Sequence, residues 1–219
     1  MIAKELISEI IPPLKTSDLG QTALNWMETF KISHLPIVNN HEFLGVISDS
    51  DIYDMKPDEP IGNHALTLLK PYVNTNQHIF EVIGIAARLK LTIVPVLDDN
   101  NFKGVITLQD IIKHLAEMSS LDQPGAIIVL ELTERDYSLS QIAQIIESND
   151  VKVVSMYVTS SADSTKLEIT IKLNSNEILS VIRTFERYNI SVKTWTANSD
   201  SIDRFYQERL DLLMKYLNI

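Results

Sequence analysis

The chain of 219 residues contains no cysteine, which excludes disulfides, thiolate catalysis and cysteine-ligated zinc. It has only six glycines, and it lacks the glycine-rich phosphate loops and the nucleophile elbow that mark several enzyme classes. No apolar run approaches the roughly 18 residues of a membrane span, and residues 1–10 lack the apolar core of a signal peptide. These absences predict a cytoplasmic protein with no membrane contact.

Positive charge is also scarce, because 19 basic residues face 29 acidic ones and the net charge is −10. Nucleic-acid binding needs clustered Lys and Arg, so we expect no nucleic-acid partner. No two of the five histidines stand at the i, i+4 spacing of a helical metal site, so no metal is expected. Nothing assembles a nucleophile, a base and an oxyanion donor, which predicts that the protein is not an enzyme.

The first half of the sequence contains an internal repeat at a constant offset of 59 residues. The stretches Ile32–Ile52 and Leu91–Ile111 align without a gap. Identical residue types at this offset include Pro36 and Pro95, Phe43 and Phe102, Gly45 and Gly104, and Asp51 and Asp110.

Each copy predicts the order helix, strand, strand, helix. The glycine in the second strand indicates a β-bulge or a close backbone approach. A two-stranded unit is marginal alone, so the two copies are expected to form one pseudo-symmetric domain. The predicted strands are Leu35–Val38, Phe43–Ser48, Val94–Leu97 and Phe102–Thr107, and the following helices begin at Asp51 and Asp110.

This doubled pattern resembles a tandem pair of cystathionine-β-synthase (CBS) domains, often called a Bateman module. The resemblance covers residues 1–120, with repeats at about 1–59 and 60–120. It implies a regulatory module that binds an adenosine-containing ligand between its repeats.

Two motifs of the pattern [S/T]-x-x-D carry the candidate chemistry, Ser48–Asp51 and Thr107–Asp110. One interpretation is structural, because this spacing is nearly a capping box at a strand-to-helix junction, which contributes about 1 kcal/mol. The other is functional, because a helix N-terminus and a hydroxyl suit a phosphate and a carboxylate can bind ribose hydroxyls. The sequence leaves both open.

The resemblance implies a role for each candidate ligand-binding residue. Asp51 and Asp110 would hold ribose, and Ser48, Ser50 and Thr107 would lie near phosphate. Thr16 and Thr75 would line the same cleft, and His34 occupies a position before the proline that is often basic.

The charge of the first half bears on the ligand. Residues 1–120 hold 9 basic and 15 acidic residues, a net charge of −6, which opposes a polyphosphate. ATP is therefore disfavoured unless magnesium intervenes, and AMP, ADP or S-adenosylmethionine fits better. We expect that no cofactor is required. The alternative is that one or both clefts hold no ligand.

The second half follows a Pro-Gly break at Leu121–Gly125. Its apolar patterning predicts the order βαββαβ, a ferredoxin-like plan and an overall α+β class. Ser138 and Gln141 are placed as a capping box for its first helix, with Tyr137 and Ile142 as a hydrophobic staple. The expected strands are Ala126–Leu132, Val151–Thr159, Leu167–Leu173 and Ile190–Trp195, with helices starting at Ser138 and at Asn174 and a final helix over Ser201–Ile219.

Residues 126–200 resemble an ACT domain, and the whole arrangement is similar to the acetoin-utilisation B family. Amino-acid-binding ACT domains usually carry a glycine at the first strand–helix turn, but residues 135–138 here are Arg-Asp-Tyr-Ser, which disfavours amino-acid binding. The resemblance implies a homodimer. Two hypotheses remain, a ligand sensor that signals to its own ACT-like domain or a protein partner, and a homodimeric docking protein with empty clefts.

Overall fold

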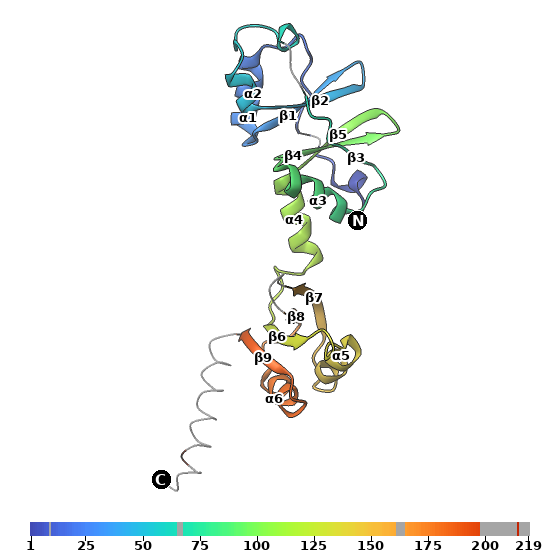
Figure 1. Ribbon diagram of the computed structural model, residues 1–219, viewed down its shortest axis with the longest axis vertical. Helices are drawn as coiled ribbons and strands as arrows, with labels where there is room; N and C mark the ends of the chain where they lie inside the picture. Colours follow the sequence, from blue (N-terminus) through green and yellow to red (C-terminus); the bar gives the residue numbers. More distant parts are fainter. Residues whose placement is uncertain (9, 65–67, 161–164, 198–213, 215–219) are drawn as a thin grey trace. The chain divides into compact units, whose positions relative to one another are not determined.

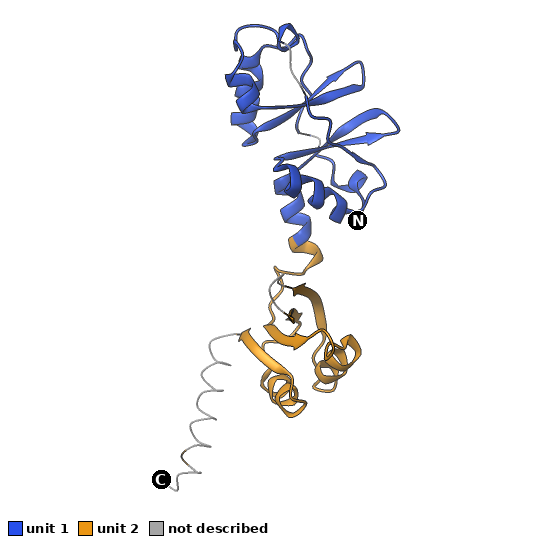
Figure 2. Ribbon diagram, in the orientation of Figure 1, with its two compact units in different colours: residues 1–115 blue, residues 116–219 orange. Residues whose placement is uncertain are grey.

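The computed structural model describes residues 1–8, 10–64, 68–160, 165–197 and 214. The chain forms two compact units, residues 1–115 and 116–219 (Figure 2). The division falls inside one helix, α4, and so precedes the domain end that we expected at residue 120.

The first unit contains two copies of a helix–hairpin–helix arrangement (Figure 1). The predicted strands are present, but the helices after them begin two residues earlier than predicted, because Ser48 and Thr107 lie directly before them. Its elements are η1 (Ala3–Leu6), α1 (Gly20–Phe30), β1 (His34–Asn39), β2 (Glu42–Ser48), α2 (Asp49–Tyr53), η2 (Ile61–Asn63), β3 (Val73–Asn74), α3 (Ile79–Leu89), β4 (Ile93–Asp98), β5 (Asn101–Thr107) and α4 (Leu108–Met118).

The strands form one five-stranded sheet in the order β1-β2-β5-β4-β3. The two hairpins are antiparallel and have the same irregularity in register, between Ile37 and Val38 in one and between Val96 and Leu97 in the other. These positions are 59 residues apart, so the sequence repeat is also a structural repeat. In the described sheet, the two hairpins are joined where Glu42 of β2 pairs with Asn101 of β5.

The segments that precede each repeat cross over to the other repeat. The N–H of Ser8 donates to the carbonyl of Val105 at 2.8 Å, and the N–H of Val46 donates to the carbonyl of Leu69 at 2.9 Å. Gly45 makes the second crossing possible, since an added Cβ would lie 2.6 Å from Leu68 Cβ. The glycine therefore marks a close approach as well as a bulge, and both predictions are confirmed.

The described residues of the second unit form a four-stranded sheet in the order β7-β8-β6-β9 and the helices α5 and α6 (Figure 1). All pairings are antiparallel, and the chain order is βαββαβ, so the predicted α+β class and ferredoxin-like plan are confirmed. The elements are β6 (Ile127–Thr133), α5 (Leu139–Glu147), β7 (Val153–Ser160), β8 (Lys166–Leu173), α6 (Leu179–Arg187) and β9 (Ser191–Thr196).

The helices of the second unit cover one face of its sheet. Ile128 and Leu130 are fully buried and alternate with half-buried neighbours, as a strand with one covered face requires. Ser138 caps α5 by accepting from the Gln141 N–H at 3.4 Å, which confirms its half of the predicted capping box; the described structure shows no return bond from the Gln141 side chain. The remaining core comes from α5, α6 and β8, including Ile142, Ile145, Ile146, Val181, Ile182, Phe185, Ile169 and Ile171.

The predicted start of the second helix at Asn174 is wrong. The Asn174 side chain accepts a hydrogen bond from the N–H of Lys152 at 2.8 Å, so it is used beside β7, and α6 begins at Leu179. The expected helix over 201–219 lies outside the described residues, apart from Met214. In the described part of the chain, no helix has both the length and the apolarity needed to cross a membrane.

Candidate ligand site

Equivalent positions of the two repeats meet at the start of β1 and β4. Ser33 and Thr92 are 59 residues apart, and the N–H of Ser33 donates to Thr92 Oγ1 at 3.0 Å. His34 Nδ1 lies 3.0 Å from Thr92 Oγ1 and accepts from the N–H of Thr92 at 3.3 Å. These contacts tie the first repeat to the second at an approximate two-fold axis.

The first motif, at the end of β2, is a complete capping box. The N–H of Asp51 donates to Ser48 Oγ at 3.2 Å, and the N–H of Ser48 donates to Asp51 Oδ2 at 2.8 Å. The hydroxyl of Ser50 lies 2.8 Å from that of Ser48. His34 pairs with Ser48 across the hairpin. Four of the predicted site residues are therefore neighbours.

The second motif, at the end of β5, has the same arrangement. The N–H of Asp110 donates to Thr107 Oγ1 at 3.1 Å, and the hydroxyl of Thr107 donates to Asp110 Oδ2 at 2.6 Å. Ile93 pairs with Thr107, so this motif has an apolar neighbour where the first has His34.

In both motifs, only one carboxylate oxygen is used by the cap. The described structure shows hydrogen bonds to Oδ2 of Asp51 and of Asp110 and none to their Oδ1 atoms. A capping carboxylate that keeps one free oxygen can still accept a hydrogen bond from a ligand hydroxyl. The structural and functional interpretations of the motif are therefore compatible.

The sequence profile of the CBS domain matches residues 4–58 and 68–117. The first half of the chain is a tandem pair of CBS domains. Among curated proteins, inosine-5'-monophosphate dehydrogenase of Methanocaldococcus jannaschii is 26% identical over 130 residues, which cover 58% of this chain and 26% of the enzyme. The chain thus spans about a quarter of the length of that relative.

Two solved structures are similar to about half of this chain. A CBS domain pair/ACT domain protein from Thermotoga maritima has 21% identity and a TM-score of 0.48, over 53% of this chain and 98% of that one. A putative acetoin utilization protein from Vibrio cholerae has 20% identity and a TM-score of 0.48, over 56% of this chain and 95% of that one.

His34 is the ionisable group at the contact between the CBS repeats. Burial lowers the pKa of His34 below its ordinary value, and the carboxylates of Asp49 and Asp51 oppose that shift. Because His34 Nδ1 accepts the Thr92 N–H, the neutral ring is the form that the contact requires.

The CBS pair should therefore lose stability in mild acid through His34. Since the folded pKa is lowered, the contribution of His34 is fully present above its unfolded pKa of about 6.5 and is lost as pH falls through the folded value. Urea unfolding between neutral pH and about pH 5.5, above the main carboxylate range, measures this loss. His34→Ile, which copies Ile93 of the second repeat, should flatten the pH dependence. His41→Asn, at an exposed histidine, is the control and should leave the pH dependence of unfolding unchanged. If His34→Ile does not alter this pH dependence, the assignment of the loss to His34 is wrong.

Thr16 and Thr75 are not brought to the motifs. Thr16 Oγ1 accepts from Asn39 Nδ2 at 2.9 Å, and Asn39 is at the opposite end of β1 from His34, about 16 Å away at 3.3 Å per residue. The Thr75 hydroxyl lies 3.4 Å from Asp98 Oδ1, at the corresponding end of β4. The predicted ligand-binding residues thus form two sets. Most lie at or beside the two motifs, whereas Thr16 and Thr75 lie at the hairpin-turn ends of β1 and β4.

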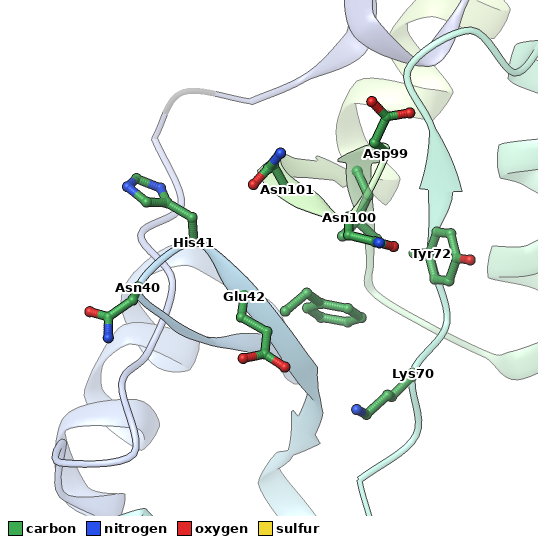
Figure 3. A pocket seen from close by; sticks show the side chains of 10 residues that line it. Asn40, His41, Glu42, Lys70, Tyr72, Asp99, Asn100 and Asn101 are labelled. Atoms are coloured by element: carbon green, nitrogen blue, oxygen red, sulfur yellow. The ribbon is translucent and has the colours of Figure 1, made fainter.

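The hairpin-turn end of the CBS pair has a polar hollow of its own. This hollow has a volume of about 460 Å³. Figure 3 shows Glu42 and Lys70 on opposite sides of it, with the asparagines of both turns around it. Beside it, the rings of Phe43 and Phe102 stack with centroids 6.3 Å apart. These two residues are also equivalent, so repeat-related contacts hold the CBS pair together at both ends.

Thr92 and Asp49 are site residues that the sequence reasoning missed. Thr92 bonds to His34, and Asp49 affects the pKa of His34. A signal was present, because Ser33 and Thr92 place a hydroxyl at the same position of both repeats. The sequence alone does not predict that these equivalent positions are in contact.

Proposed function

We propose that the CBS pair binds an adenosine-containing metabolite beside the Ser48–Asp51 and Thr107–Asp110 motifs, and that the chain is a regulatory, non-enzymatic sensor. One solved structure that is similar to this chain, CBSX2, is a complex with AMP. The observation that carries the proposal is the unused Oδ1 atom of each motif aspartate, which can accept from ribose hydroxyls without breaking the helix cap.

The first motif is better equipped for a ligand than the second. It adds the imidazole of His34 and the hydroxyl of Ser50 to the shared aspartate and hydroxyl. With Nδ1 accepting from Thr92, the neutral ring carries its proton on Nε2 and is a hydrogen-bond donor there. A single phosphate, as in AMP, or an uncharged adenosyl group suits this site better than ATP, given Asp49 and Asp51 nearby.

The second unit is proposed to be an ACT-like domain that receives the signal, within a cytoplasmic homodimer. Its ferredoxin-like strand order supports this assignment. Within this unit, Ser119, the residue after the end of α4, accepts at its carbonyl from the Ser155 hydroxyl of β7 at 3.3 Å.

A second candidate function is a homodimeric docking protein with empty CBS clefts. The observation that favours it is that both motif caps are closed by the side chains of their own residues. A capping box needs no ligand to be stable.

Ligand-dependent thermal unfolding should separate the two functions. AMP, ADP, ATP, adenosine and S-adenosylmethionine would each be tested with and without magnesium. A ligand at one hundred times its Kd adds about 2.7 kcal/mol, which should raise Tm by roughly 5–10 °C at 2–4 °C per kcal/mol. Asp51→Ala or Asp110→Ala should abolish that shift, in addition to a loss of about 1 kcal/mol from the cap.

Asp136→Ala is the matched control for these variants. Asp136 makes the same local arrangement with Thr133 in the second unit, with the Thr133 hydroxyl donating to Asp136 Oδ2 at 2.6 Å. It should lose stability without losing the ligand shift. No shift with any adenosine compound, while both motif variants lose only the cap contribution, would instead support the docking function.

A further inference from the structure

A separate hollow of about 640 Å³ lies on the second repeat, between the N-terminal segment and the ends of β3, β4 and β5. Two main-chain hydrogen bonds fix its walls. The N–H of Lys4 donates to the carbonyl of Thr75 at 3.0 Å, and the N–H of Ser8 donates to the carbonyl of Val105 at 2.8 Å. None of its described lining residues belongs to either CBS motif.

The described lining of this hollow is net positive in a chain of net charge −10. It holds Lys4, Lys103 and one carboxylate, Asp98. Lys103 Nζ lies 3.5 Å from Asp98 Oδ2, and the Thr75 hydroxyl lies 3.4 Å from Asp98 Oδ1. Among the residues that the structure describes, none forms an ion pair with the Lys4 ammonium, whereas Lys103 is paired with Asp98.

The equivalent place in the first repeat lacks both lysines and the carboxylate, although Lys70 stands there at the position of Ile11. At the 59-residue offset, Lys103 becomes Leu44, Lys4 becomes Asn63 and Asp98 becomes Asn39. Asn39 and Thr16 satisfy each other there, at 2.9 Å and 3.3 Å, and Leu44 packs against the core. The equivalent place therefore folds without either lysine, and both lysines are specific to the hollow beside the second hairpin.

We propose that this hollow binds a small organic anion with an apolar body. The anionic group lies between the ammonium groups of Lys4 and Lys103, where two positive charges act on it at once. The apolar body lies against Ile11 and Phe102, which line the same hollow. This site is independent of the adenosine site proposed above.

Phenyl phosphate is a suitable probe, because it combines an aromatic ring with a phosphate, and benzyl alcohol is its neutral counterpart. Calorimetric titration at low salt should show binding of phenyl phosphate that weakens as salt is added, and no comparable binding of benzyl alcohol. The double variant Lys4→Asn, Lys103→Leu copies the first repeat and should bind at least about tenfold more weakly, which corresponds to 1.4 kcal/mol. Its thermal unfolding shows whether the fold is intact.

A second variant keeps this test distinct from that of the adenosine site. Asp51→Ala, Asp110→Ala should bind phenyl phosphate as the unaltered chain does, even if no adenosine compound binds. The proposal is overturned if the lysine variant keeps full affinity or if benzyl alcohol binds equally well. It is also overturned if binding is lost in the aspartate variant, since the probe would then occupy the CBS motifs.

Discussion

Replacing Gly45 by alanine should destabilise the CBS pair by about 2–5 kcal/mol, combining backbone strain with overpacking. Gly45 has φ of +153°, and an added Cβ would lie 2.6 Å from Leu68 Cβ and 2.8 Å from the carbonyl oxygen of Leu69. That carbonyl accepts the N–H of Val46, so the alanine would push the crossing segment away from β2. Urea unfolding of the natural protein and of Gly45→Ala measures this difference in the free energy of unfolding.

Gly84→Ala is the matched control, with the opposite sign. Gly84 lies inside α3, and an added Cβ there would meet no atom within 4 Å. Alanine is favoured over glycine in a helix interior by about 0.5–1 kcal/mol, so this variant should be more stable than the natural chain. Equal effects of the two substitutions would show that the crossing at Gly45 does not constrain the fold.

The repeat made most of the first unit predictable. The 59-residue offset determined which residues would be equivalent, and the hairpins, the bulges and the Gly45 approach all follow it. The crossing of each preceding segment to the opposite repeat was not predictable. Local patterns give periodicity and turns, whereas the hydrogen bond from Ser8 to Val105 joins residues far apart in the chain.

The candidate site was predictable where it is local and not where it depends on packing. Ser48 and Asp51 are three residues apart, and their spacing alone predicts the cap that the structure shows. The contact of His34 with Thr92 spans 58 residues and arises because the two repeats pack about an approximate two-fold axis. The position of Thr16 also depends on packing, since its hydroxyl accepts from Asn39, 23 residues away in the chain.

Competing hydrogen bonds explain the error at Asn174. Asparagine is a favoured helix cap, and Glu177 stands at the capping distance, so the local pattern is sound. In the structure, the N–H of Lys152 donates to the side-chain oxygen of Asn174. Because this oxygen is used in a tertiary hydrogen bond, Asn174 does not cap the helix. The apolar spacing of Val181, Ile182 and Phe185 still identified the buried face correctly.

Phe185→Ala should destabilise the second unit by about 3–5 kcal/mol, the usual cost of removing a buried aromatic side chain. Phe185 is fully buried among the strands and helices of that unit. Leu139→Ala, at a side chain that is 54% exposed in the same unit, should change stability by no more than about 0.5 kcal/mol. A similar loss in both variants would contradict the assignment of Phe185 to the core.

The two tryptophans allow each unit to be followed separately in this experiment. Trp26 packs against the core of the CBS pair, and Trp195 packs against the core that contains Phe185. With Trp26 changed to Phe, Trp195 fluorescence should report the full loss caused by Phe185→Ala; with Trp195 changed to Phe, Trp26 should report an unaltered transition. The adenosine-dependent shift of the CBS pair should then survive Phe185→Ala. If instead both tryptophans report the same loss, the units unfold as one cooperative system, and a ligand bound in the CBS pair would stabilise the second unit directly.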